Sequence, residues 1–203
     1  KASLMSAYAL YSQNYYDDAI FNLERHIKNY PKDKDLVYAH YLIAICYFEQ
    51  LHDEKKDLKP LVKAREKFEY ILKKYPNTDY AIDAKWKMGL IVDQMAAKEM
   101  YIGRYYMKME KWIAAINRFK FVVKYYDTTI YIEEALHRLV EIYYKIGLVE
   151  DAQKIAATLG YNYGSGEWYK NSYRIFNKSY KTAKITKKKK DSFIREKFKK
   201  LFE

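Results

Sequence analysis

The side chains best suited to acid–base or metal chemistry are few and widely spaced. No HExxH motif and no paired Cys/His spacing connects the four histidines. We therefore expect each to be a helix-surface residue rather than a metal ligand. The single cysteine lies in an apolar run, as is typical of a small buried hydrophobe, and one cysteine makes no intramolecular disulfide or Cys-based zinc site. The histidines are His26, His40, His52 and His137, and the cysteine is Cys46.

Two pairs of adjacent carboxylates, Asp17-Asp18 and Glu133-Glu134, stand at the starts of predicted helices. Negative charge at that position offsets the helix dipole, so neither pair requires a catalytic role. The glycine-rich segment 160–166, predicted to be a loop, lacks the Gly-Lys-Ser/Thr of a phosphate-binding loop and follows a helix rather than a strand. No pair of nucleophile and base is indicated either. The sequence predicts a non-enzymatic protein without cofactor or metal.

The remaining candidates are polar and aromatic side chains that interrupt apolar helix patterns. Arg118 follows Asn117 within an apolar run and fits two roles. It is either a solvated charge or a planar donor aimed at a partner's carboxylate, for which guanidinium geometry is well suited. Tyr38 and Tyr41 line another predicted helix, where tyrosines suit packing and a binding groove equally well. The candidate protein-binding residues are therefore Tyr38, Tyr41, Arg104, Tyr105, Tyr106, Asn117 and Arg118.

Most of these candidates lie on two amphipathic helices between Met100 and Tyr126. Apolar residues recur there at steps of three and four, the spacing of one helix face. A short polar break at Glu110-Lys111 separates the halves, so the two helices must fold back as an antiparallel hairpin. The predicted apolar stripes are Ile102, Tyr105, Tyr106 and Met109 in the first half, and Ile113, Ile116, Phe119, Val122 and Val123 in the second.

The same two-helix pattern recurs along the chain. Each second helix carries a small residue, an apolar or aromatic residue four positions later, and a closing tyrosine with or without proline. The small residue allows close helix approach, and proline stops the helix. This is the pattern of the tetratricopeptide class, whose period is near 34 residues. The anchors are Ala19, Ala64, Ala115 and, in a weaker copy, Ala152.

We predict an all-α, tetratricopeptide-like right-handed superhelix of about four helix pairs with a C-terminal capping helix. The capping helix is predicted at Glu167–Phe176, with Trp168, Tyr169, Tyr173 and Phe176 on one face. The irregular spacing of the repeats has two predicted causes. One is a polar insertion at 52–57, and the other is a long helical run from about Ala81 to Met109, which Gly89 and Gly103 could bend or divide.

Composition and charge support a helical body and a separate tail. The chain has only 6 Gly and 3 Pro but 24 Tyr in 203 residues, and its formal charge is +12. Residues 178–203 hold 11 Lys and Arg against 3 Asp and Glu. We therefore divide the chain into a repeat domain at 1–176 and a basic amphipathic extension at 177–203. The extension is either a solvated terminus or a contact for acidic lipid or polyanions. Nucleic acid is not expected as a partner, because the basic residues do not continue along the body.

The ordered motifs resemble those of the BamD family, tetratricopeptide lipoproteins of the bacterial machinery that assembles outer-membrane β-barrels. The resemblance covers roughly residues 5–176 and does not include the lysine-rich tail. The matching segments are Asp18-Ala19-Ile20 with Arg25 to Pro31, Tyr38 to Leu42 with Tyr47-Phe48, Tyr75 to Ala81, Lys98-Glu99 with Arg104-Tyr105-Tyr106, Trp112 to Arg118, Glu133 to Leu136, Val140-Glu141, Gly147-Leu148, and Trp168-Tyr169.

The resemblance implies a scaffold at the periplasmic face of the outer membrane, monomeric outside its complex. Family members bind the last POTRA domain of the barrel subunit BamA, mainly through their C-terminal repeats, and work with other subunits to receive unfolded β-barrel proteins. The matching docking position here is Arg118 with its neighbours. The family's lipidated cysteine and first repeat have no counterpart in this sequence, so we expect the lipid anchor to belong to a longer precursor. The alternative is a general tetratricopeptide adaptor with a different partner. Such an adaptor could equally act in the cytosol.

Overall fold

The computed structural model describes residues 2–50 and 57–177, all of whose regular elements are α-helices. The predicted all-α class is therefore confirmed. Most of the predicted polar insertion, with His52, and the basic extension from residue 178 lie outside the described residues. The helices are α1 (Ala2–Ser12), α2 (Tyr16–Asn29), α3 (Leu36–Glu49), α4 (Lys59–Lys74), α5 (Asp79–Lys108), α6 (Trp112–Tyr125), α7 (Ile132–Lys145), α8 (Val149–Tyr163) and α9 (Glu167–Phe176).

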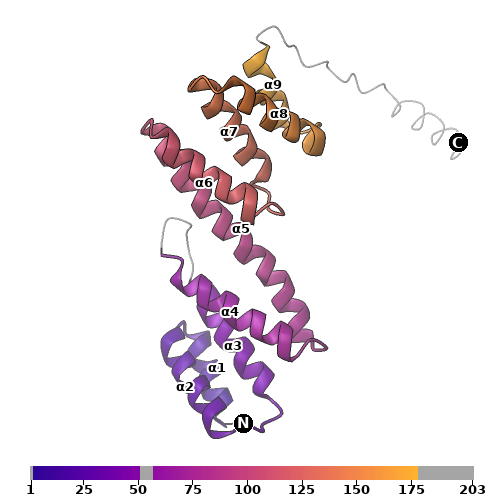
Figure 1. The fold of residues 1–203 in the computed structure, drawn as a ribbon. Coiled ribbons are helices and arrows are strands. Elements are labelled where there is room, and N and C mark those ends of the chain that lie inside the picture. Colours follow the sequence, from indigo (N-terminus) through magenta and orange to yellow (C-terminus); the bar gives the residue numbers. More distant parts are fainter. Residues whose placement is uncertain (1, 51–56, 178–203) are drawn as a thin grey trace, which may run out of the picture.

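The helices stack as four successive pairs (Figure 1). The pairs are α1/α2, α3/α4, α5/α6 and α7/α8, and each new pair packs its first helix on the second helix of the pair before. The fold is thus tetratricopeptide-like. All four anchoring alanines are completely buried, as close approach within a pair requires. Helix α9 packs on α7 and α8 at the end of the stack, in the predicted capping position.

The closing tyrosines end the second helices as the repeat pattern predicts. Helices α2, α4 and α6 stop one residue before Tyr30, Tyr75 and Tyr126. All three tyrosines leave the helical conformation at similar backbone angles, with φ between −129° and −134°. Proline at the next position in the first two cases cannot continue a helix, and Asp127 occupies that position in the third.

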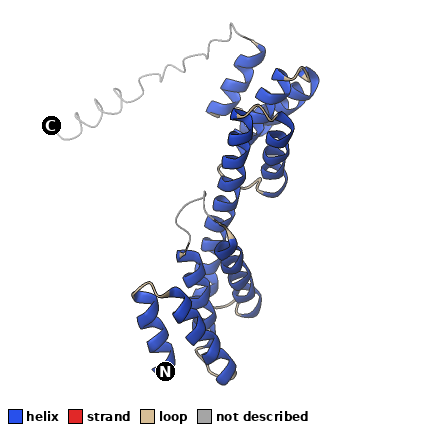
Figure 2. Cartoon of the chain, turned by 90° about the vertical axis from the view of Figure 1, so that its left-hand side faces the viewer, coloured by secondary structure: helices blue, strands red, loops and turns tan. Residues whose placement is uncertain are grey.

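Helix α5 is a continuous 30-residue helix shared by two cores. Its first half, up to Ile91, packs with α3 and α4, whereas its second half, from Ala96, packs with α6 and α7. At 1.5 Å per residue its length is about 45 Å, and it joins the two groups of helices seen in Figures 1 and 2. The predicted long helix is confirmed, and neither glycine divides it.

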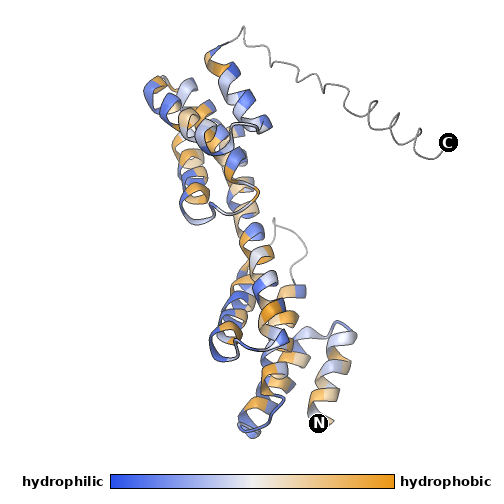
Figure 3. Ribbon diagram, turned by 90° about the vertical axis from the view of Figure 1, so that its right-hand side faces the viewer, coloured by the Kyte–Doolittle hydropathy of each residue, from blue (hydrophilic) through white to orange (hydrophobic). Residues whose placement is uncertain are grey.

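Two of the predicted apolar stripes differ from the buried faces in the structure. In the second half of α5 the buried residues are Ala96, Ala97, Met100 and Gly103, whereas Tyr105 and the following Met109 are exposed. On α6, Ile113 is 69% exposed although it keeps the helical spacing of the core. Small residues on α5 let the Phe119 ring approach the helix axis, so the core lies beside Gly103 and the larger side chains are left outside. Figure 3 shows hydrophobic and hydrophilic residues interspersed along the helices.

The end of the stack also departs from the prediction. Helix α8 continues to Tyr163, so the segment predicted as a loop is helical over its first four residues. An ideal Cβ on Gly160 would lie 2.7 Å from the Tyr169 ring, which shows that this glycine lets α9 pack closely on α8. On α9 itself Tyr173 is exposed, and Ser172 is the fully buried residue.

The two glycines of α5 give a matched pair of stability predictions. Gly89 has open space around an added Cβ, so Gly89→Ala should raise the free energy of unfolding by about 1 kcal/mol through helix propensity. At Gly103 an added Cβ would lie 2.6 Å from Cε1 of Phe119, so Gly103→Ala should lower it by about 1–3 kcal/mol. Urea titration of both variants measures the two changes in the free energy of unfolding. Changes of the same sign would contradict the prediction.

The turns within the pairs predict a second pair of opposite effects. Glu110 (φ 56°) and Gly147 (φ 87°) adopt left-handed conformations between α5 and α6 and between α7 and α8. In both turns the next residue's N–H bonds to the carbonyl five positions back, from Lys111 to Tyr106 and from Leu148 to Tyr143. Glu110→Gly should therefore stabilise by about 0.5–1 kcal/mol, and Gly147→Ala should destabilise by about 1 kcal/mol. Thermal unfolding distinguishes the two signs, and a lower Tm for Glu110→Gly would count against this account.

None of the described helices combines the length and apolarity required to cross a bilayer.

Candidate protein-binding surface

Three of the candidate residues meet in one shallow pocket between the end of α5 and α6. Tyr106, Asn117 and Arg118 line a hollow of about 300 Å³ together with Ala114 and Phe121. The Arg118 side chain is 42% exposed, so its guanidinium reaches the pocket while its stem packs between the helices. The pocket thus offers planar hydrogen-bond donors next to aromatic surface, a combination that suits a partner's carboxylate.

The guanidinium of Arg118 is held in place by Glu99 of α5. Nη1 donates to Glu99 Oε2 at 3.0 Å, and the carboxylate is more buried than its partner. This bond uses one of the five N–H donors of an arginine. Glu99 therefore fixes the orientation of Arg118 and lowers the entropic cost of presenting its other donors to a ligand.

An exposed apolar stripe on α6 borders the pocket. Ile113 and Phe121 each lie one helical turn from Asn117, on either side of it, so the three residues occupy the i, i+4 and i+8 positions of the outer face. The Phe121 ring stacks on Tyr125 with centroids 4.6 Å apart, and the exposed Tyr105 stands beside Tyr106 on α5. Apolar and aromatic side chains around one arginine are characteristic of the energetic centre of a protein interface.

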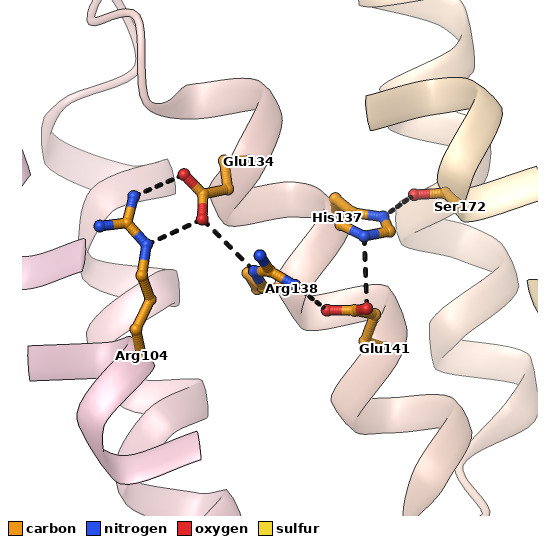
Figure 4. Close-up of polar contacts among 6 residues, drawn as sticks. All are labelled: Arg104, Glu134, His137, Arg138, Glu141 and Ser172. Carbon is orange, nitrogen blue, oxygen red and sulfur yellow. Dashed lines mark hydrogen bonds and ion pairs between the residues drawn. The ribbon is translucent and has the colours of Figure 1, made fainter. Parts of the chain in front are cut away.

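Arg104 belongs to a different flank of α5. Its guanidinium forms a two-pronged ion pair with Glu134 of α7, with Nε 2.8 Å from Oε1. Glu134 also bonds Arg138, which in turn bonds Glu141 at 2.6 Å (Figure 4). The structure thus separates Arg104 from Arg118, and each has an intramolecular carboxylate partner. Arg104 contributes to a charged network that joins α5 to α7.

The carboxylates of this network have shifted acidities. Burial of Glu134 alone would raise its pKa, but the hydrogen bond from Arg104 and the charges of Arg104 and Arg138 outweigh burial, and the pKa lies below its ordinary value. Glu141 behaves in the same way, because His137 and Arg138 outweigh its burial and lower its pKa. Both groups are therefore ionised near neutral pH.

Two histidines occupy buried positions, so the prediction of helix-surface histidines is wrong for them. His137 is buried between Ser172 Oγ, 2.7 Å from Nδ1, and Glu141 Oε1, 3.4 Å from Nε2 (Figure 4). His26 is similarly placed, with Ser3 Oγ 2.8 Å from Nδ1 and Oδ2 of Asp33, four residues after the end of α2, 3.3 Å from Nε2. Their serine partners tie the outermost helices, α1 and α9, to the stack.

These Ser–His–carboxylate groups have structural rather than catalytic geometry. Ser172 has no exposed surface, so no substrate can reach its hydroxyl. The serine in each group bonds Nδ1 and the carboxylate approaches Nε2, so the histidine connects two helices. Within the residues that the structure describes, no three His, Cys, Asp or Glu side chains are grouped so as to hold a metal ion.

Tyr38 and Tyr41 lie in the other half of the molecule. Tyr38 lines a hollow of about 340 Å³ with Met5 of α1 and Tyr80 of α5. Tyr41 packs on Tyr80 and donates a hydrogen bond to Asp83, and burial followed by this bond raises its pKa. Tyr41 therefore links α3 to α5, whereas Tyr38 lines the hollow.

The fold and this surface together define a class of protein. A stack of helix pairs with an exposed apolar stripe and a partly exposed arginine is typical of tetratricopeptide-like repeat proteins. The sequence did not reveal that Ile113 and Phe121 are exposed, or that Glu99 holds the guanidinium of Arg118. The one available signal was that Arg118 and Glu99 both interrupt apolar positions of neighbouring helices.

Comparison with known proteins gives the family. Residues 1–159 match the outer membrane lipoprotein family YfiO. Over 177 residues the chain is 45% identical to the outer membrane protein assembly factor BamD of Caulobacter vibrioides, covering 87% of this chain and 58% of that protein. The corresponding protein of Rickettsia prowazekii is 42% identical over 175 residues, covering 86% and 70%. The chain belongs to the BamD family of outer membrane lipoproteins, as its motifs predicted, and it spans a little over half the length of the Caulobacter relative.

Proposed function

We propose that this chain is a non-catalytic adaptor in the assembly of outer-membrane β-barrel proteins. It binds the POTRA region of the barrel subunit BamA through the surface of α5 and α6 around Arg118. The observation that carries this proposal is the partly exposed guanidinium of Arg118, which lines a pocket together with the exposed Phe121. The names of the relatives, which are assembly factors, support the same role.

The proposal extends to location and to further partners. The protein acts at the periplasmic face of the outer membrane, held there by a lipid on its precursor, next to the other subunits of the assembly machinery. Unfolded β-barrel proteins are its transient ligands. The hollow at Tyr38 offers an aromatic wall for such a ligand, separate from the POTRA surface, because it lies on the α1–α3 side of the long helix.

Direct binding tests the proposal. The full chain, immobilised, should retain the purified POTRA region of BamA from the same organism, with a 1:1 stoichiometry by light scattering. Gly89→Ala, which changes α5 far from the proposed surface, is a suitable control and should bind equally well. Failure of the unmodified chain to bind any POTRA domain would reject the proposed function and favour an adaptor with another partner.

A further inference from the structure

One flank of α4 carries a row of lysines that the packing of the helix does not explain. Lys63, Lys67 and Lys74 occupy positions i, i+4 and i+11 of the helix, and Tyr70 occupies i+7, so the four side chains lie along one flank. We call the three lysines the lysine row. At 1.5 Å per residue the row extends for about 16 Å. The buried residues of α4 lie on another face and are Leu61, Ala64, Phe68 and Ile71.

The ammonium groups of the row are not neutralised by carboxylates. Within residues 2–50 and 57–177, no ion pair joins Lys63, Lys67 or Lys74 to an acidic side chain. Two of the lysines lie over aromatic rings instead. Nζ of Lys63 is 5.2 Å from the ring centroid of Tyr47, and Nζ of Lys74 is 5.3 Å from that of Tyr70. Lys74 also donates a hydrogen bond to the Tyr70 hydroxyl at 2.8 Å.

Acidic residues near the row lie at its edges. Glu69 pairs with Arg65 at 2.8 Å on another flank of α4, and Glu66 is exposed beside them. On α2, Glu24 raises the pKa of Tyr47, in addition to the effect of burial, which places that carboxylate near the Lys63 end. Helix α4 has six Lys or Arg against two Glu, so the flank keeps an excess of positive charge.

A buried histidine beside the row is kept neutral. The His40 ring of α3 packs on Tyr70 and Tyr75, with centroids 4.6 Å and 6.4 Å away. Burial, followed by the charges of Lys67 and Lys74, lowers the pKa of His40 to about 4. The positive charge of this end of the row therefore acts on its surroundings, and His40 adds a neutral aromatic surface at pH 7.

The repeat relates the lysine row to the Arg118 surface and shows how the two differ. When α4 and α6 are aligned on their anchoring alanines, Lys67 takes the place of Arg118, and Tyr70 takes the place of Phe121. Arg118 is a planar group held by Glu99, which suits one directed pair with a carboxylate. Lysine is a point charge on a flexible stem, which suits attraction to many negative charges without a fixed geometry. Equivalent positions of the two helices are thus suited to different partners.

An anionic membrane surface has the chemistry that fits these features. Clusters of lysine on a helix are attracted to acidic phospholipid headgroups, and each lysine contributes independently. Tyrosine rings next to the ammonium groups are amphipathic and favour the boundary between membrane and water. The chain belongs to a family of outer membrane lipoproteins, so a bilayer surface is within its reach.

We propose that the lysine row of α4 binds anionic phospholipid headgroups and holds the first two helix pairs against the membrane surface. The ammonium groups contact the headgroup phosphates, and the rings of Tyr47 and Tyr70 lie at the same level. These two pairs form one of the two groups of helices that α5 joins (Figure 1). The inference does not depend on binding of the POTRA region, because vesicles without any protein partner test it.

Vesicle sedimentation with the full chain measures this binding. The vesicles consist of phosphatidylcholine with about one third phosphatidylglycerol, in about 0.1 M NaCl. The triple variant Lys63→Glu, Lys67→Glu and Lys74→Glu should bind at least about 30-fold more weakly, since each lysine near such a surface contributes about fivefold. Binding of the unmodified chain should fall steeply at about 1 M NaCl. No binding of the unmodified chain to these vesicles would reject the proposal.

A matched triple variant separates the row from net charge. Lys108→Glu, Lys120→Glu and Lys124→Glu make the same change in charge at three exposed lysines of α5 and α6. This control should lose less than about threefold in binding. Residues 178–203 are unchanged in both variants, so that basic segment contributes equally to each. Equal losses in the two variants, or no loss in the first, would overturn the proposal.

Two further measurements define what the row recognises. The variant Lys63→Arg, Lys67→Arg and Lys74→Arg keeps the charge and should bind vesicles within about twofold of the unmodified chain. A large loss there would indicate a ligand of fixed geometry and would overturn the lipid assignment. Binding to polyglutamate without binding to vesicles would assign the row to an acidic protein segment instead. Cys46 has no exposed surface, so its lack of reaction with a maleimide confirms that each variant is folded.

Discussion

Replacement of Arg118 by glutamate should weaken binding of the POTRA region by about 100-fold or more, which corresponds to roughly 3 kcal/mol. The variant loses the guanidinium N–H groups, which would donate hydrogen bonds to a partner's carboxylate. It also places a second negative charge next to Glu99, whose Oε2 now lies 3.0 Å from the guanidinium. Isothermal titration with the purified POTRA region measures the loss directly.

A matched substitution separates the site from net charge. Lys120→Glu makes the same change in charge sign on α6, but Lys120 lies over the Tyr143 ring on the side of α7 and is not part of the pocket. It should change affinity by less than about threefold, since a charge at the rim acts mainly on the association rate. Equal losses for Arg118→Glu and Lys120→Glu would show that binding depends on overall charge and would remove the specific role of Arg118.

Glu99→Gln examines how Arg118 is held. The amide keeps a hydrogen-bond acceptor but no charge, so the guanidinium is less firmly oriented and its charge is less compensated. If a partner's carboxylate competes with Glu99 for the guanidinium, affinity should rise slightly. If Glu99 instead pre-orients Arg118 for the partner, affinity should fall about threefold to tenfold. We expect the fall, because Glu99 holds Arg118 through Nη1 while Arg118 also lines the pocket.

The arrangement of helices could be predicted from sequence because it depends on local signals. Alanine at each anchor and tyrosine at each close act within a single helix or turn. The structure confirms the buried alanine in all four pairs and the closing tyrosine after α2, α4 and α6. The length of α5 followed in the same way, because no proline interrupts its helical pattern. Periodicity therefore sufficed for the class of fold and for the order of the pairs.

The partners of the polar side chains could not be predicted in this way. Arg118 pairs with a residue 19 positions away, Arg104 with one 30 positions away, and Ser172 with a histidine 35 positions away. A helical pattern gives the face that a residue occupies but not the neighbour opposite it. Ile113 shows the same limit for apolar residues. It keeps the spacing of the core, yet it lies on the outer face of α6 and is exposed.

The largest expected effect on stability comes from Glu134, the centre of the network between α5 and α7. Glu134→Ala should lower the free energy of unfolding by about 2–3 kcal/mol. Its carboxylate is 11% exposed and binds both Arg104 and Arg138, so the variant removes the ion pair between α5 and α7, while Arg138 keeps its bond to Glu141. We expect less than the 3–5 kcal/mol typical of a fully buried pair, because Arg104 is 42% exposed and water can solvate it. Urea unfolding at pH 7 provides the measurement, and Glu133→Ala on the same helical turn, with a change below about 0.5 kcal/mol, is the control.

The pH dependence of this effect follows from the lowered pKa of Glu134. A carboxylate whose folded-state pKa lies below its ordinary value of 4.5 contributes stability that is fully present above pH 4.5. That contribution is lost as the pH falls through the folded-state pKa. The difference between the unmodified chain and Glu134→Ala should therefore be constant from pH 7 to pH 6 and shrink by pH 3. A difference that stayed constant down to pH 3 would mean that Glu134 stabilises the stack by packing, and that its ion pairs with Arg104 and Arg138 contribute little.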